Sequence, residues 1–255
     1  MTLTLLCITA FTAGFVDAIA GGGGLIQLPV LLLVLSTTPT ATILGTNKLI
    51  AFTGTAVATF QYTRRITINW RSILPAAGAA FALSFLGARV VSLVPSAFLR
   101  PVILVLLALV AGFVILKRDF GTVSPQPISR SWQLRAGLAA SAAIGFYDGF
   151  FGPGTGSFLI FALVSIFALD FLHASASAKV INAATNLSAL LYFAISGQIL
   201  YDIALPMIAC NVLGGIAGAR LAIARGSKLV RVFFIAAVCL VILRLGYDLA
   251  QSWLV

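Results

Sequence analysis

The chain has 255 residues, of which 61% are hydrophobic and only 9% are charged, and its formal net charge is +10. Soluble domains carry roughly 25% charged residues, so this composition excludes an ordinary water-soluble protein. The basic residues separate apolar segments instead of forming a stripe beside aromatic residues, which excludes nucleic acid and favours anionic lipid as their partner.

Five apolar segments follow one another in the first half of the chain, at 3–20, 24–35, 40–62, 71–93 and 96–116. We predict that they are helices, because only helices and closed barrels satisfy the backbone in lipid. A crossing takes about 20 helical residues, so the second segment is too short to span and is predicted to be a half-helix. The first segment lacks the basic start and cleavage site of a secretory signal and is kept in the fold.

The second half repeats the first at a single offset of 131 positions. Asp17 recurs as Asp148, Lys48 recurs as Lys179, and the sequence GAR at 87–89 recurs at 218–220. We therefore predict two repeats of about five helical elements each, at 1–116 and 132–255, which form one transmembrane domain. The polar segment 117–131, with two prolines, is the predicted linker.

The distribution of basic residues predicts that the two repeats have opposite orientations. The loop at 64–71 holds three arginines, whereas its counterpart at 196–202 holds an aspartate and no basic residue. The next loop reverses the bias, with one arginine at 94–100 against two arginines and a lysine at 225–231. Cytoplasmic loops are enriched in Lys and Arg, so we expect an inverted-topology duplication with a cytoplasmic linker and both termini outside. The first two elements of each repeat either both cross or form a re-entrant hairpin.

Glycine-rich turns open the second element of each half, with GGGG at 21–24 and GPGTG at 152–156. A helix N-terminus presents unpaired N–H groups and a partial positive charge, and glycine lets an anion approach the backbone. We predict that the two turns form one anion site near the midplane, where broken helices of inverted repeats meet. Alternatively, the glycines only permit close helix crossing.

Polar side chains accompany these turns. Lys48 and Lys179 either attract an anion or act as struts paired with Asp17 and Asp148, and each aspartate is either a proton carrier or an inert partner. Asparagines on the third elements donate to substrate oxygens or join helices. The predicted substrate-binding residues are Gly21, Gly22, Gly23, Gly24, Gln27, Asn47, Lys48, Gly152, Gly154, Thr155, Gly156, Ser157, Lys179, Asn182 and Asn186. The predicted proton-coupling residues are Asp17 and Asp148.

Neither a metal site nor a cofactor is predicted. Cys7, Cys210 and Cys239 are scattered in apolar runs without metal-ligand spacing. His173, which follows Asp170 in a short connection, is expected to be solvated and has no evident nucleophile or metal partner.

Four stretches resemble the sulfite exporter family of the TauE/SafE type: GFVDAIAGGGGLIQLP, GFYDGFFGPGTGSF, AKVINAATN and NVLGGIAGARLA. The resemblance covers nearly the whole chain. It implies a carrier in the bacterial inner membrane for sulfite, thiosulfate or organosulfonates such as sulfoacetate, and export is the expected direction. It does not separate these substrates. The expected partners are the small anion and membrane lipids, and a homodimer is possible.

Two other classes of function are considered. An intramembrane aspartyl protease needs two aspartates, and Tyr147–Asp148 supplies one of the expected pairs, but Val16 precedes Asp17 and no Gly-x-Gly-Asp sequence occurs. The chain is therefore not expected to be an enzyme. A channel or cation-coupled carrier would use backbone oxygens for sodium, and the lysines argue against it.

Overall fold

The computed structural model describes residues 2–99, 102–103, 105–106 and 129–252, and this part of the chain is helical with short connections. The first half contains α1 (Thr2–Ala20), α2 (Gly23–Val34), α3 (Thr40–Thr63) and α4 (Trp70–Leu93). The second half contains α6 (Arg130–Phe150), α7 (Thr155–Phe167), α8 (Phe171–Ile195) and α9 (Tyr201–Ser252). The all-α fold predicted from the sequence is confirmed.

Helix boundaries differ from the predicted ones at two places. α6 begins at Arg130, inside the segment predicted to be linker, because the Ser129 hydroxyl accepts a hydrogen bond from the Trp132 N–H and caps the helix. α9 continues through the last two predicted segments and breaks at Gly226, where φ is 72°. Most of the predicted segment 96–116 and of the linker lies outside the described residues.

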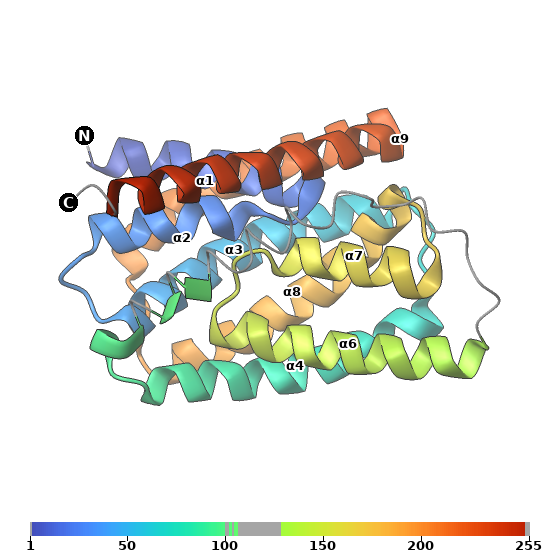
Figure 1. The fold of residues 1–255 in the computed structure, drawn as a ribbon, viewed down its shortest axis with the longest axis horizontal. Coiled ribbons are helices and arrows are strands. Elements are labelled where there is room, and N and C mark those ends of the chain that lie inside the picture. The colour runs from blue at the N-terminus through green and yellow to red at the C-terminus, as the bar shows by residue number, and fades with distance from the viewer. Residues whose placement is uncertain (1, 100–101, 104, 107–128, 253–255) are drawn as a thin grey trace.

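The first two helices of each half form a hairpin whose tip is a glycine turn inside the molecule. In Figure 1, α2 runs from the middle of the molecule toward the end that carries the N-terminus, and α7 runs from the middle toward the opposite end. α2 has 12 residues, so at 1.5 Å per residue it is only about 18 Å long, against about 30 Å for a membrane core. With 13 residues in α7, the second helix of each hairpin is too short to span a membrane core, as predicted for a half-helix.

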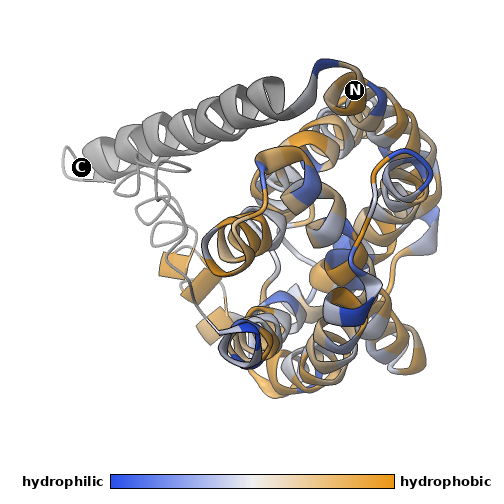
Figure 2. Ribbon diagram, turned by 90° about the vertical axis from the view of Figure 1, so that its right-hand side faces the viewer, coloured by the Kyte–Doolittle hydropathy of each residue, from blue (hydrophilic) through white to orange (hydrophobic). Residues whose placement is uncertain are grey.

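Four helices of the described chain are long and apolar enough to cross a membrane: Leu3–Ala20 of α1, α4, α8, and Tyr201–Gly226 of α9. Figure 2 shows apolar residues along most of the helical ribbon, with short hydrophilic stretches between them. Large apolar side chains such as Leu33, Leu74 and Ile195 are exposed on the outer surface. A surface of this kind suits lipid, and the chain is a polytopic membrane protein.

Packing in one half mirrors packing in the other. α1 lies against α9 as α6 lies against α4, and α3 contacts α9 as α8 contacts α4. The closest approaches also match, since a Cβ on Gly14 would collide with the backbone of Asn211 and a Cβ on Gly145 with that of Ala80. Both pairs of positions are 131 residues apart. Small residues at these crossings allow helices to pack without a hydrophobic driving force, as membrane helices must.

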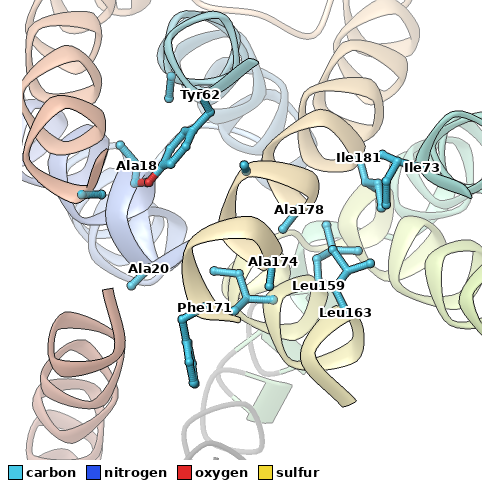
Figure 3. Packing of buried hydrophobic residues seen from close by; sticks show 14 of the residues in the cluster. Ala18, Ala20, Tyr62, Ile73, Leu159, Leu163, Phe171, Ala174, Ala178 and Ile181 are labelled. Carbon is cyan, nitrogen blue, oxygen red and sulfur yellow. The ribbon is translucent and has the colours of Figure 1, made fainter. Parts of the chain in front are cut away.

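The buried core contains few large side chains and many alanines. Figure 3 shows one cluster, in which α7 and α8 contribute Leu159, Phe171 and Ile181. The Tyr62 side chain reaches from α3 to the end of α1, where its hydroxyl donates a hydrogen bond of 3.0 Å to the Ala18 carbonyl. This contact fixes the end of α3 against the base of the first glycine turn.

Candidate functional site

The two glycine turns meet each other at the centre of the molecule. Gly21, Gly152 and Gly154 have φ values of 76°, 98° and 83°, in the left-handed region that favours glycine. A Cβ on Gly21 would collide with the backbone of Gly156, and a Cβ on Gly156 would collide with Gly21. The glycines thus allow the backbones of the two hairpin tips to come into direct contact.

The N-termini of α2 and α7 present free backbone donors at this meeting point. The caps are Gly22 and Gly154, and neither helix has a side-chain cap. Gly23, Gly24 and Gly156 lie in the first turns of these helices, where backbone N–H groups have no partner within the helix. Each helix N-terminus also carries about half a positive charge, so this place favours an anion.

Two buried ion pairs lie beside the turns, and each joins one half of the chain to the other. Lys48 Nζ from α3 lies 2.8 Å from Asp148 Oδ2 on α6, and Lys179 Nζ from α8 lies 2.7 Å from Asp17 Oδ2 on α1. The two pairs occupy positions that match at the offset of 131. The lysines therefore pair with the aspartates, and they do so crosswise between the halves.

The two pairs are held differently. Asp17 Oδ2 accepts hydrogen bonds from Lys179 at 2.7 Å and from Thr55 at 3.3 Å, and its side chain is 19% exposed. Asp148 has a side chain only 2% exposed. Its Oδ2 atom, despite lying close to the Lys48 ammonium, accepts no well-aligned hydrogen bond from any described residue. Asp148 forms one ion pair with the described residues, and its partner is Lys48.

A chain of side-chain amides completes the site. Gln27 donates to Asn47 at 2.8 Å, and Asn211 donates to Gln27 at 3.2 Å. On the other side, Asn186 accepts from Lys48 at 3.1 Å and donates to Asn182 at 3.3 Å. Amides offer both donors and acceptors, so this network can orient the oxygen atoms of a bound anion.

These groups surround a central cavity of about 30 Å³. One water needs about 10–15 Å³, so an oxyanion larger than water requires the hairpin tips or the ion pairs to move apart. The lining residues are Ala13, Asp17, Gly21, Gly23, Gly24, Gln27, Asn47, Lys48, Ala51, Thr55, Asp148, Gly152, Gly154, Thr155, Gly156, Asn182, Asn186 and Asn211.

Most residues predicted for the site lie in this lining, and a few lie elsewhere. Gly22 is not in it, and the Ser157 hydroxyl donates to the Ala20 carbonyl at 2.9 Å, where it joins the two hairpins. Lys179 reaches the cavity only through Asp17. Asn211 and Thr55 line the cavity but were not predicted. The repeat gives no signal for Asn211, because its counterpart is Ala80.

Gly21→Ala should destabilise the protein strongly, whereas Gly22→Ala should have little effect. Left-handed backbone costs a residue with a Cβ about 1–2 kcal/mol, and the Cβ at Gly21 would also strike the Gly156 backbone. At the adjacent Gly22 the nearest atoms to an added Cβ are 3.9 Å away. Thermal unfolding of both variants in detergent tests this, and equal melting temperatures would contradict the tight contact between the turns.

Comparison with known proteins identifies the family of the chain. The family model described as sulfite exporter TauE/SafE matches residues 6–245. A probable membrane transporter protein of Sinorhizobium, ORF9, is 36% identical over 96% of this chain and 93% of its own length. A probable membrane transporter protein of Haemophilus influenzae is 34% identical over 98% of this chain and 96% of its own.

More distant similarity extends to Bacillus subtilis, whose probable membrane transporter protein YunE is 27% identical over 87% of this chain and 89% of its own length. No solved structure matches the chain. The match of the family model over nearly the whole chain, with relatives at 34% and 36% identity, shows that this protein belongs to the TauE/SafE sulfite exporter family.

Proposed function

We propose that the protein is a secondary transporter that exports sulfur-containing anions across the bacterial inner membrane. The substrates in this proposal are sulfite, thiosulfate or organosulfonates such as sulfoacetate. The anion is held near the midplane between the N-termini of α2 and α7, and alternating exposure of this site moves it across. Membership of the family and the names of the relatives support transport, and the central cavity supports an anionic substrate.

The single observation that supports an anionic substrate is the convergence of two uncapped helix N-termini on a cavity that is lined by Lys48, with the Lys179 ammonium behind it in an ion pair with Asp17. With both lysines and both aspartates charged, the side chains sum to zero. The two helix ends add about one positive charge together, which balances a monovalent sulfonate. A divalent anion such as thiosulfate needs one further positive charge, which protonation of an aspartate supplies.

The arginines support the orientation predicted from the sequence. Arg64 and Arg65 follow α3, Arg71 begins α4, and Arg130 begins α6, so all four lie at one end of the molecule. This end is the cytoplasmic one in our proposal, because cytoplasmic loops are enriched in arginine and lysine. The linker 117–131 is then cytoplasmic and both termini are periplasmic.

Export is the direction that the membrane potential favours. An inside-negative membrane drives an anion outward with about 2.3 kcal/mol per charge per 100 mV, so export needs no coupled ion. Uptake of the same anion would need a cotransported proton, and Asp17 and Asp148 are the carboxylates placed to carry it.

The proposal is tested with the purified protein in liposomes loaded with labelled sulfite. An inside-negative potential should accelerate sulfite efflux compared with liposomes that lack protein. External sulfoacetate should reduce this efflux, because it competes for the same site from the opposite face. A matched variant with both Lys48→Met and Lys179→Met should lose this flux. Movement of labelled sodium without sulfite would replace our proposal with a cation carrier or channel.

A further inference from the structure

A second cavity lies at the arginine-rich end, between α4, α6 and α8. Its volume is about 650 Å³, within the roughly 300–1,000 Å³ range of small-molecule sites. The N-termini of α4 and α6 border it and contribute partial positive charge. Its polar lining residues are Thr67, Asn69, Ser72, Arg130, Gln133, His173 and Ser177.

The charge of this cavity is positive. The His173 ring nitrogen Nδ1 lies 2.5 Å from Asp170 Oδ2, so that a protonated imidazole there would already be balanced by a carboxylate. Arg130, in contrast, forms no ion pair with any residue in the described part of the chain. Arg130 therefore contributes positive charge to the lining.

Ser177 is the lining residue of α8 that lies nearer along the chain to Lys179. Its side chain is 3% exposed, lines the cavity, and has no hydrogen-bond partner among the described residues. Lys179 follows two residues later on α8, about 3 Å further along the helix axis. The inner end of the cavity therefore reaches the level of the central ion pairs.

The matching place at the opposite end of the molecule is shut. Thr46 matches Ser177 at the offset of 131, and its hydroxyl accepts a hydrogen bond of 3.0 Å from the N–H of Leu200. Beside it, Gly45 lies so close to the loop that a Cβ would collide with the carbonyl oxygen of Gln198. The loop between α8 and α9, residues 196–200, thus closes directly on α3.

Two differences in sequence explain why one end is open and the other shut. Ala176 stands where the first half has Gly45, so its methyl group obstructs an equally close approach of the loop between α3 and α4. Gly197 turns the closed loop with φ of 67°, whereas Ile66 at the matching position does not have a positive φ. A β-branched residue takes up that conformation only at high cost.

We propose that the cavity between α4, α6 and α8 is the cytoplasmic entrance through which an oxyanion reaches the central site. The loop 196–200 is the gate that shuts the matching entrance on the periplasmic side. This inference rests on the proposed transport function for the identity of the ligand, but its geometry can be tested without any substrate.

The first experiment measures cysteine labelling from each side of the membrane, with the three native cysteines replaced by serine. Ser177→Cys should react with a membrane-impermeant maleimide in inside-out vesicles. Thr46→Cys should react at least about tenfold more slowly in right-side-out vesicles, since a closed thiol reacts only in the molecules that open. Equal rates, or faster labelling of Thr46→Cys, would overturn the assignment of open and shut ends.

The second experiment tests whether the entrance selects anions. An anionic thiosulfonate reagent should react with Ser177→Cys faster than a cationic reagent of similar size, after correction for their rates with a free thiol. Adding Arg130→Gln should reduce this preference at least about threefold, because it removes a positive charge from the lining of the cavity. No preference for the anionic reagent would rule out an anion entrance even if the cavity is open.

The third experiment opens the gate. Gly45→Ala should raise labelling of Thr46→Cys from the periplasmic side at least about tenfold, since the Cβ holds the loop off α3 and shifts the population. Gly197→Ile should do the same through backbone strain, because isoleucine does not tolerate the positive φ of this position. Gly78→Ala is the matched control, because a Cβ there meets nothing within 4 Å. Unchanged labelling in both gate variants would overturn the gate, whereas loss of sulfite flux with the labelling as expected would contradict only the transport proposal.

Discussion

Asp148→Asn is expected to abolish the pH dependence of anion transport, whereas Asp17→Asn should retain part of it. Asp148 is enclosed and its ion-pair partner among the described residues is Lys48, whereas Asp17 is partly exposed and accepts hydrogen bonds from both Lys179 and Thr55. A proton on Asp148 releases the Lys48 ammonium to face an anion. Asparagine is uncharged at every pH, like the protonated carboxyl, and it has no acidic proton to release.

The thermal stability of the same variant should show whether an anion binds beside Lys48. Removing one partner of a buried ion pair typically costs about 3–5 kcal/mol, so Asp148→Asn should unfold at a lower temperature in detergent. Added sulfite should recover part of this loss, because the anion then pairs with Lys48. Transport that keeps its full pH dependence in liposomes would make Asp148 a structural residue and leave the anion site to the glycine turns.

Lys48→Met is expected to weaken anion binding by about 10- to 100-fold, because a hydrogen bond to a charged group contributes about 1.5–3 kcal/mol. This variant alone does not separate a binding group from a strut, since it also leaves the Asp148 carboxylate buried without its partner. The free energy of unfolding and the sulfite affinity must therefore be measured on the same preparation.

The double variant Lys48→Met/Asp148→Asn separates the two roles. It removes both charges at once, so the free energy of unfolding should recover to within about 1 kcal/mol of the native value, as buried pairs replaced by neutral residues often do. Sulfite affinity should stay low. Recovery of both stability and affinity would show that Lys48 is only a strut. The matching double variant Lys179→Met/Asp17→Asn provides the same comparison in the other ion pair.

The helices were predictable because their signals are local. The apolar segment 40–62 became α3, Thr40–Thr63, and the short segments after the glycines became α2 and α7. The start of α6 at Arg130 was missed because the polar, proline-containing stretch before it masks the cap at Ser129. The inverted orientation of the repeats in the membrane stays a prediction.

The site was predictable only as far as the repeat reaches. Positions that recur in both halves, such as Lys48 and Lys179, could be predicted from the repeat. Asn211 could not, because it lines the cavity from a position whose counterpart in the first half is alanine. The sequence also left open which lysine pairs with which aspartate. That choice depends on how the two halves pack, because each half contributes one aspartate and one lysine to these ion pairs and each of the four pairs with a residue of the other half.

The crosswise ion pairs have a consequence for synthesis of the chain. Asp17 and Lys48 leave the ribosome before their partners Lys179 and Asp148 have been made, more than 99 residues later. A charged residue at the centre of an inserting helix costs about 2.5–3.5 kcal/mol. The first half is therefore a strained insertion intermediate, and truncation before residue 148 should send it to membrane quality-control proteases instead of leaving a stable fragment.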